Sequence, residues 1–262
     1  MILTDSHTHL YYETEADKRA ALIQRCLDNN VKRLFLPNVN TATIPLVFGL
    51  CADFPENCFP MLGLHPCDVK EVAVDDCLRY VDELEAIREA ITTRKIYAVG
   101  EIGIDLYWDK TTLEIQKQAF RTQIDWAIEL NLPIVIHCRD AFDEIFEILR
   151  EKKHEKLRGI FHCFTGTIEQ AQKVIEMGFL LGIGGVVTYK NSGLDKVVAD
   201  IPLAHLVLET DSPYLTPVPY RGKPNESSYL IYMAEKIADL HQTSIEEVAL
   251  ITTENSKRVF GI

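Results

Sequence analysis

IYAVGEIG (residues 96–103), TTLEIQKQAFRTQIDWAIELN (111–131) and LPIVIHC (132–138) follow one another along the chain. The first and third runs are largely apolar and rich in β-branched residues, which is typical of parallel strands covered on both faces. The second opens with two threonines, a cap-like start, and then has apolar residues at helical spacing. Those in register are Leu113, Phe120, Ile124 and Ile128. Together the three runs predict a strand, a helix and a second strand parallel to the first.

Short apolar runs of this kind recur along the whole chain. The eight runs are ILT (2–4), VKRLFLP (31–37), FPMLGLHP (59–66), IYAVGEIG (96–103), LPIVIHC (132–138), GIFHCF (159–164), FLLGIGG (179–185) and LVLETD (206–211). Segments with helical spacing lie between them, and two further helices are expected near 225–240 and 244–258. In the first such segment, 15–30, the residues expected on one side of a helix are Ala16, Ala20, Ile23 and Leu27.

Eightfold strand–helix alternation predicts an α/β fold, and at this length it fits a single (β/α)8 TIM barrel. A doubly wound open sheet is the alternative. It is less favoured because no glycine-rich phosphate loop follows the first run. No low-complexity linker or break in composition marks a second domain, so one domain is expected over 1–262.

The composition is that of an ordinary globular protein, with 47% hydrophobic and 25% charged residues. The sequence has no apolar run of the ~20 residues that cross a bilayer, and no basic segment followed by an apolar stretch at its start. We therefore expect a cytoplasmic protein without membrane association. The net charge of −12 argues against a general nucleic-acid coat. It does not exclude an enzyme acting on nucleic acid, because bound divalent ions add positive charge.

The seven cysteines are scattered and form no CxxC pair, so they favour reduced, mostly buried thiols over a zinc ribbon or a redox motif. They are Cys26, Cys51, Cys58, Cys67, Cys77, Cys138 and Cys163.

The chain begins MILTDSHTHL, which places two histidines two residues apart behind a short apolar run. On an extended strand Asp5, His7 and His9 would share one face, and two imidazoles so placed can bind one metal ion with a carboxylate orienting them. A pair of surface histidines is the alternative for this motif taken alone.

Metal-ligand side chains recur at the ends of the predicted strands, where a barrel of this kind has its active site. They are His7, His9, His65, Glu101, His137, His162 and Asp211. Any one of them could be a hydrogen-bonded core residue, but buried acids without partners are costly, and these would lie beside histidines. Six strong ligands exceed one tetrahedral shell, so two ions are expected, with Glu101 as the bridge. The mixed nitrogen and oxygen ligands suit zinc or manganese better than magnesium. Cys138 and Cys163 are expected to face away and pack.

The chain resembles the TatD family of metal-dependent deoxyribonucleases, a branch of the amidohydrolase-like barrels. The resemblance rests on DSHTHL, GLHP, VGEIGID, IHCRDA, FHCFTG, LETDSPYL, RGKPNE and TTENSKRVF, in this order along the chain. Other branches often place a carbamylated lysine on the fourth strand, whereas this position is Glu101. One departure is Ser227, which follows RGKPNE where the family usually has proline.

The resemblance implies a nuclease of single-stranded DNA, acting as a 3′–5′ exonuclease with two divalent ions (zinc, manganese or magnesium). It places His7, His9, Glu101 and Asp211 around one ion, and Glu101, His137 and His162 around the other. His65 would then contact a phosphate or the attacking water. Asp211 is the expected general base, and Asp105 and Glu209 are expected to support the site.

Cations outside the metal ligands are expected to hold the substrate phosphates, namely Arg221 and Lys223 in the loop after the eighth run and Arg139 after His137. Tyr107, Trp108 and Tyr214 lie on loops at the same mouth and fit either base stacking or loop packing. The partner expected is single-stranded DNA, bound transiently, with no obligate protein partner. Two other functions stay open: a small-molecule amidohydrolase or lactonase using the same metals, and a non-enzymatic barrel with structural metals.

Overall fold

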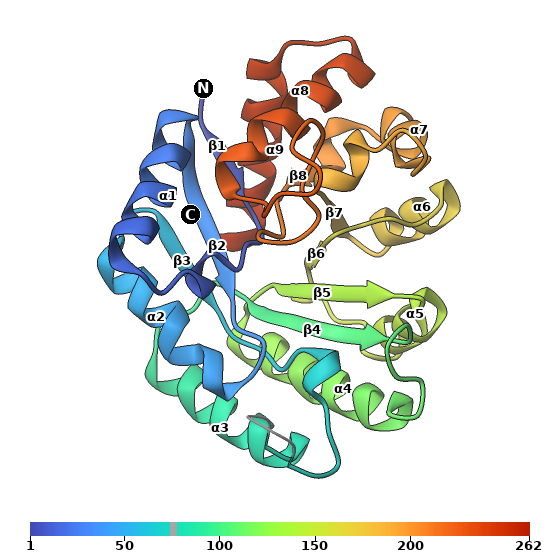
Figure 1. Cartoon of the computed structure of the whole chain (residues 1–262). Helices are drawn as coiled ribbons and strands as arrows, with labels where there is room; N and C mark the ends of the chain where they lie inside the picture. The colour runs from blue at the N-terminus through green and yellow to red at the C-terminus, as the bar shows by residue number, and fades with distance from the viewer. Residues whose placement is uncertain (74–77) are drawn as a thin grey trace.

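The computed structural model describes residues 1–73 and 78–262, and these contain eight parallel strands that alternate with helices (Figure 1). The strands are β1 (Leu3–Asp5), β2 (Val31–Pro37), β3 (Cys58–Met61), β4 (Val99–Asp105), β5 (Ile134–Arg139), β6 (Gly159–Phe161), β7 (Phe179–Ile183) and β8 (Leu206–Leu208). The helices are α1 (Ala16–Asp28), α2 (Ile44–Asp53), α3 (Tyr80–Thr93), α4 (Leu113–Leu130), α5 (Phe142–Glu151), α6 (Ile168–Glu176), α7 (Leu194–Ala199), α8 (Leu230–His241) and α9 (Ile245–Phe260).

The strands form a barrel in which two pairs of neighbouring strands are not joined by a regular ladder. Regular parallel ladders join β1 through β3 and β4 through β8. A few backbone hydrogen bonds join the two arcs, among them those from the amide of Gly100 to the carbonyl of Leu62 at 2.9 Å and from the amide of Ser6 to the carbonyl of Leu208 at 3.0 Å. The predicted (β/α)8 barrel is thereby confirmed.

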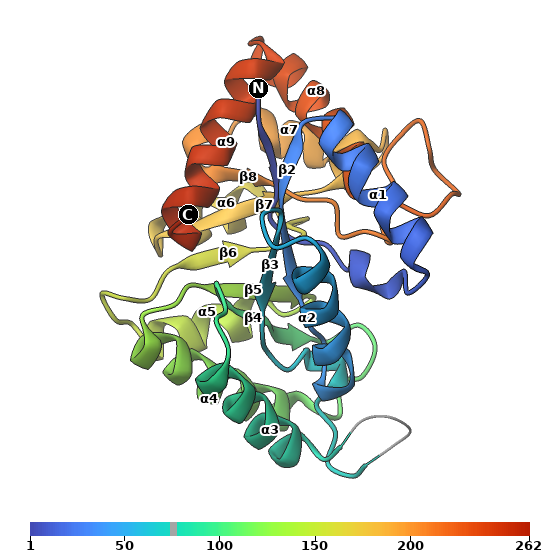
Figure 2. The same cartoon turned by 90° about the vertical axis from the view of Figure 1, so that its left-hand side faces the viewer.

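The barrel interior is closed at one end by the last helix. Phe260, at the end of α9, stacks on Phe35 of β2 with ring centroids 3.7 Å apart. Every strand except β1 contributes a side chain to the cluster around this pair, in the case of β4 from Ala98 directly before the strand. It consists of Phe35, Met61, Ala98, Val135, Ile160, Leu180, Val207, Val259 and Phe260. Figure 2 shows α9 running along the barrel beside the first strand, where it packs against β1 and β8.

Strand β4 is buried along its whole length and lies very close to β5. At Gly103, whose φ is 150°, an added Cβ would meet the carbonyl oxygen of His137 at 2.0 Å. Only glycine allows this approach. The pairing brings Glu101 and His137, on neighbouring strands, into one cluster.

Two expectations about the elements were wrong in detail. Ala16 and Ala20 are exposed, whereas Ile23 is buried as expected and Cys26 is buried with it, because these larger side chains have more apolar area to bury. The helix expected from 225 begins only at Leu230, after a 3-10 turn at Ser227–Tyr229. None of the described helices is long and apolar enough to cross a membrane.

Candidate metal centre

The structure brings together the seven ligand-type side chains named from the sequence, on or just beyond six of the strands. Glu101 and His137 lie on β4 and β5, and His162 directly follows β6. His7 and His9 lie beyond the end of β1, His65 beyond β3 and Asp211 beyond β8. Three overlapping groups within the described chain place their ligand atoms within 4.8 Å of one another. The groups are His7, His9 and Asp211; His7, Glu101 and His162; and His65, Glu101 and His137.

Glu101 lies at the centre of the cluster, with one carboxylate oxygen facing each side. The neighbours of Oε1 are His162 Nε2 at 2.7 Å, His137 Nδ1 at 2.8 Å and His65 Nε2 at 3.3 Å. The neighbours of Oε2 are His7 Nε2 at 3.2 Å and His9 Nε2 at 3.7 Å. A carboxylate so placed can bridge two ions, as the sequence suggested.

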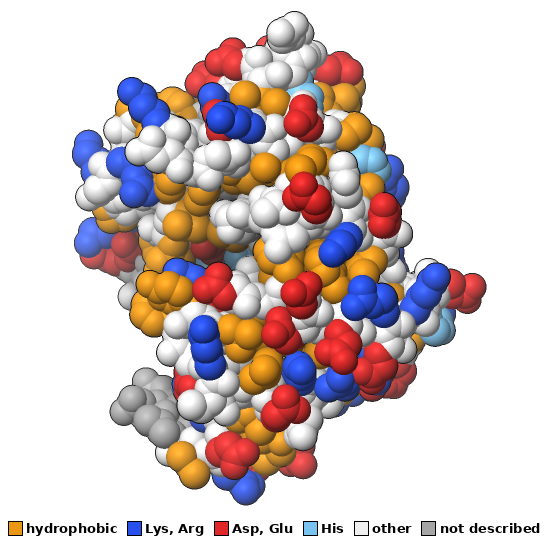
Figure 3. Space-filling model, turned by 90° about the vertical axis from the view of Figure 1, so that its right-hand side faces the viewer, with side chains coloured by type: hydrophobic (Ala, Val, Ile, Leu, Met, Phe, Trp, Pro, Cys, Tyr) orange, Lys and Arg blue, Asp and Glu red, His pale blue; other side chains and the backbone are white. Residues whose placement is uncertain are grey.

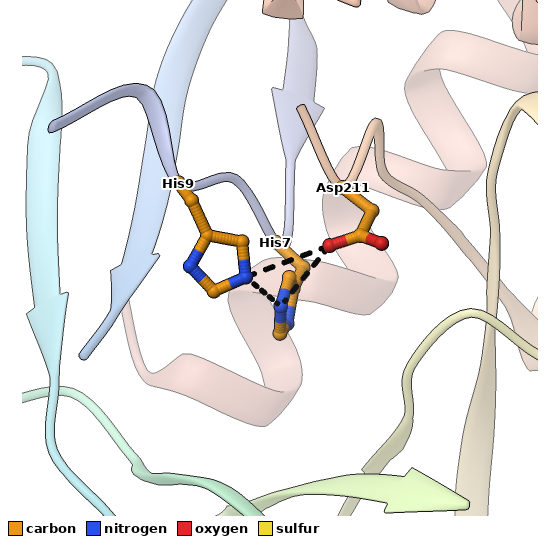
Figure 4. A group of neighbouring side chains, drawn as sticks. All are labelled: His7, His9 and Asp211. Carbon is orange, nitrogen blue, oxygen red and sulfur yellow. Dashed lines mark hydrogen bonds and ion pairs between the residues drawn. The ribbon is translucent and has the colours of Figure 1, made fainter. Parts of the chain in front are cut away.

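Asp211 faces the same two histidines as Oε2 of Glu101 (Figure 4). Its Oδ1 lies 3.5 Å from His9 Nε2 and 3.8 Å from His7 Nε2, and those two nitrogens are 3.2 Å apart. Its backbone has a φ of 53°, in the left-handed region, and its amide donates to the carbonyl of His7 at 2.9 Å. A strained backbone held by a hydrogen bond at a site of this kind fixes the direction of the carboxylate.

Hydrogen bonds on the outer ring nitrogens of His137 and His9 set which nitrogen of these rings faces the cluster. His137 Nε2 lies 2.8 Å from Asp105 Oδ2, which holds a proton on Nε2, so Nδ1 is the nitrogen that faces Glu101 and can offer its lone pair to an ion. His9 Nδ1 lies 2.8 Å from the Tyr11 hydroxyl, and His162 Nδ1 lies 3.6 Å from Glu209 Oε1. Asp105 and Glu209 therefore support the site from outside, in the positions expected of them.

His65 has the opposite arrangement. Its Nδ1 accepts a hydrogen bond from the amide of Cys67 at 3.1 Å, so in the neutral ring the proton is on Nε2. That proton points toward Glu101 and the pocket. While this hydrogen bond persists, His65 is a donor to an oxygen and does not offer a lone pair to a metal ion.

The Asp5 carboxylate accepts from the backbone amide of His7 at 3.3 Å but from neither imidazole ring, contrary to the expectation from the strand pattern. The strand ends at Asp5, so the alternation of faces does not continue to His7 and His9. Its carboxylate accepts from the hydroxyl of Thr210 at 2.6 Å and from the amide of the same residue at 3.0 Å. Asp5 thus fixes the segment that carries Asp211.

The departure at Ser227 has a clear structural role. Its hydroxyl donates to Thr8 Oγ1 at 3.0 Å, and Thr8 Oγ1 lies 2.8 Å from Ser212 Oγ. Ser227 is fully buried. This hydroxyl chain joins the segment of His7 and His9 to the segment of Asp211.

Both central acids are ionised in this setting. Burial would raise the pKa of Glu101, but the charges of His162, His65 and His7 hold that pKa well below its usual range. Burial would likewise raise the pKa of Asp211, but its hydrogen bond with His9 and the charge of His162 lower it. Carboxylates and histidines that can release their protons to an incoming cation are the donor set of a divalent-metal site, so these residues fit such ions.

The cluster forms the floor of a pocket of about 570 Å³. Figure 3 shows the face carrying α5, α6 and α7, where hydrophobic side chains border a hollow. Cys163 lines this pocket, so the expectation that it faces away and packs was wrong. Cys138 packs against the hydrophobic core as expected, although it also borders the pocket, as does Cys67. Cys163 lies past the end of β6 with a φ of 46°, where strand alternation no longer applies. Of the described cysteines, Cys26 and Cys58 are buried and the others half-buried, all are free, and Cys77 lies outside the described residues.

The three predicted phosphate-binding cations lie in different places. Arg139 lines the pocket, with its guanidinium carbon 3.9 Å from the Tyr107 ring centroid. Arg221 and Lys223 are exposed and are not among the residues that line this pocket, and Arg221 packs on the Tyr189 ring at 4.0 Å. The neighbouring Asn225 is buried and donates to the carbonyls of Thr210 and Tyr214, both at 2.7 Å, which is a structural role.

Sequence reasoning missed Tyr11 and Tyr12, which contact the His9 ring. Their signal was present in the sequence, because DSHTHL is followed directly by these two tyrosines.

Comparison with known proteins places this site in a family. A family model described as TatD related DNase matches residues 4–261. The chain belongs to this family. It is 42% identical to the metal-dependent hydrolase YabD of Bacillus subtilis, over all of both chains. It is 39% identical to the metal-dependent hydrolase YcfH of Escherichia coli K12, over all of this chain and 97% of the relative. The predicted resemblance to the TatD family is thereby confirmed.

The crystal structure of YjjV, a TatD homologue from Escherichia coli K12, superposes with a TM-score of 0.90 at 27% sequence identity, covering 99% of this chain and 98% of that one. YabD and YcfH are both described as metal-dependent hydrolases. This agrees with a cluster of histidines and acids that is able to hold metal.

Proposed function

We propose that this protein is a divalent-metal-dependent deoxyribonuclease that hydrolyses phosphodiester bonds of single-stranded DNA, in the 3′–5′ direction implied by the family resemblance. The observation that carries the proposal is the position of Glu101, whose two oxygens face two separate sets of ligands. Such a site suits the in-line displacement of an oxygen at phosphorus, which needs charge compensation at both the attacking and the leaving oxygen.

The residues suited to hold one ion are His7, His9 and Asp211, and those suited to hold the other are His137 and His162, with Glu101 shared between them. Zinc, manganese or magnesium would supply Lewis acidity that activates water and offsets charge on the phosphate.

The protein side chains have separate tasks in this reaction. Asp211 is ionised and lies at the edge of the cluster, so it can accept the proton of the attacking water. His65 carries its proton on Nε2 and can donate it in a hydrogen bond to a phosphate oxygen. Arg139 lines the same pocket and can pair with the phosphate as a bidentate donor.

The single-stranded form of the substrate follows from the depth of the centre. Glu101 and His162 are buried at the floor of the pocket, below loops that follow the strands. A phosphate in a duplex cannot reach that depth without the strand leaving its partner. We therefore propose single strands or frayed ends of DNA as the transient partner.

The test is cleavage of end-labelled single-stranded DNA by the wild type and by the Glu101→Ala variant, with and without added divalent metal. We expect metal-dependent cleavage by the wild type and a loss of at least ~1,000-fold in the variant, since its removal leaves both ligand sets incomplete. Glu114→Ala, which changes an exposed glutamate of α4, is the matched control.

The product ladder gives the direction of cleavage. A folded, metal-loaded wild type that cleaves lactones or amides but no DNA would contradict the proposal and favour the small-molecule hydrolase.

A further inference from the structure

Four large aromatic side chains are exposed at the mouth of the pocket. Trp108 is 70% exposed, Tyr107 55%, Tyr214 53% and Tyr12 40%. Tyr12, Trp108 and Tyr214 line the pocket above the metal ligands, and Tyr107 contacts Trp108. No other aromatic residue is among the exposed large hydrophobic side chains of the described chain. Such a concentration of exposed apolar surface around one opening indicates a binding surface.

The first pair, Tyr107 and Trp108, is held by the end of β4. The Asp105 carboxylate accepts from the amides of both residues, at 2.9 and 3.2 Å. The two rings meet edge to face, with centroids 5.0 Å apart. The Arg139 guanidinium lies on the Tyr107 ring at 3.9 Å, so a cation is placed beside exposed ring faces. We call this pair the β4 seat.

The second pair, Tyr12 and Tyr214, flanks His9. The centroid of the Tyr12 ring lies 5.8 Å from that of His9, with the planes 28° apart, and the Tyr214 centroid lies 6.1 Å from it. Tyr214 follows β8, which stands four places from β4 in the order of the eight strands. This pair, the β1–β8 seat, is therefore on the opposite side of the mouth from the β4 seat.

Loop packing does not account for these rings, because a packed ring is covered and these are among the most exposed apolar side chains of the molecule. Rings of this kind beside a cation bind nucleobases by stacking, which tolerates any sequence since every base has a π-face. His65 and Arg139, the groups proposed to bind the phosphate, line the same pocket.

We propose that the two seats stack the unpaired bases on either side of the scissile phosphate, one base in each. The smallest complete substrate is then a dinucleotide of any sequence. Bases within a duplex are covered on both faces by their neighbours, so the seats select single strands and frayed ends. This inference rests on the proposed nuclease function and adds the means by which the protein holds its substrate.

The test uses thymidylyl-thymidine, which has one phosphodiester and two bases, and its two analogues with hydrogen in place of the 5′ or the 3′ base. We expect Trp108→Ala and Tyr214→Ala each to lower kcat/KM on the dinucleotide by about 5- to 150-fold, mainly through KM. On the analogue that lacks the base bound by the altered seat, each variant should have the same kcat/KM as the wild type. Trp108→Phe should recover most of the activity, and Leu250→Ala, at an exposed leucine of α9, is the matched control.

The outcomes separate the two proposals. Equal losses on the dinucleotide and on both analogues would show a merely structural role and overturn the seats. Cleavage of longer single-stranded DNA with none of the dinucleotide would also overturn them while leaving the nuclease intact. Absence of cleavage on every DNA substrate would overturn the nuclease and the seats together.

Discussion

At the scale of single residues, the site depends on which ring nitrogen of each histidine carries a proton. Asp105 determines this for His137, because a carboxylate can only accept the proton of Nε2. The amide of Cys67 determines it for His65, in the opposite sense. Two histidines, one after β3 and one on β5, thus acquire different tasks, His137 offering a lone pair and His65 a proton.

The change Asp105→Asn tests this account. Asparagine can keep the acceptor for the amides of Tyr107 and Trp108, while its NH2 group faces His137 Nε2. The imidazole proton is then driven to Nδ1, which removes the lone pair directed at Glu101. We expect metal affinity to fall about 10- to 100-fold, measured by calorimetric titration of the metal-free protein.

Asp109→Asn, in the same loop but facing Thr111, is the control for this change. Unaltered metal affinity in Asp105→Asn would refute the assignment of the proton.

The ligand residues could be selected from sequence because their type and their place after apolar runs are both visible there. His7, His9, Glu101, His137, His162 and Asp211 all lie in the cluster. The roles of Asp5 and Cys163 were not predictable by the same reasoning. It assumes strand alternation, whereas β1 ends at Asp5, before His7 and His9, and Cys163 lies past the end of β6 with a positive φ.

At the scale of elements, the strands hold the site and α9 closes the opposite end of the barrel. The second run was predicted with the bounds of β2, Val31–Pro37, because it is bounded by polar turn residues. The third run extends past the strand, which ends at Met61 and leaves His65 on a loop. Sequence alone cannot show where a ladder ends when the apolar pattern continues, since the ladder depends on the neighbouring strand.

The change Phe260→Ala tests the contribution of α9. The ring is buried against Phe35, and removing it leaves a cavity at the base of the barrel interior. We expect the free energy of unfolding to fall by about 3–5 kcal/mol, measured by urea denaturation.

Leu250→Ala, on the exposed side of the same helix, should change the free energy of unfolding by no more than ~0.5 kcal/mol. A loss of under ~1 kcal/mol in Phe260→Ala would show that α9 only lies over the barrel and does not close it.

At the scale of the whole molecule, segments far apart in the sequence build one centre. His7 and Asp211 are 204 positions apart in the numbering, yet the backbone carbonyl of His7 accepts a hydrogen bond from the amide of Asp211 at 2.9 Å. The regular repeat of strand and helix made the barrel predictable. The loops were not, because their course depends on contacts such as that of Ser227 with Thr8, which no local pattern shows.

The distribution of charge explains how an acidic chain can act on DNA as proposed. The net charge of −12 is spread over the whole molecule, whereas the centre gathers histidines that bind cations. Divalent ions held there would reverse the local sign without changing the rest of the surface.

The central claim is that Glu101 stands between two ions, and anomalous diffraction from crystals grown with Mn²⁺ tests it most directly. Our account predicts two anomalous peaks on either side of the Glu101 carboxylate. One lies among His7, His9 and Asp211, and the other lies beside His137 and His162. A single peak, or peaks that leave Glu101 without a metal contact, would contradict it.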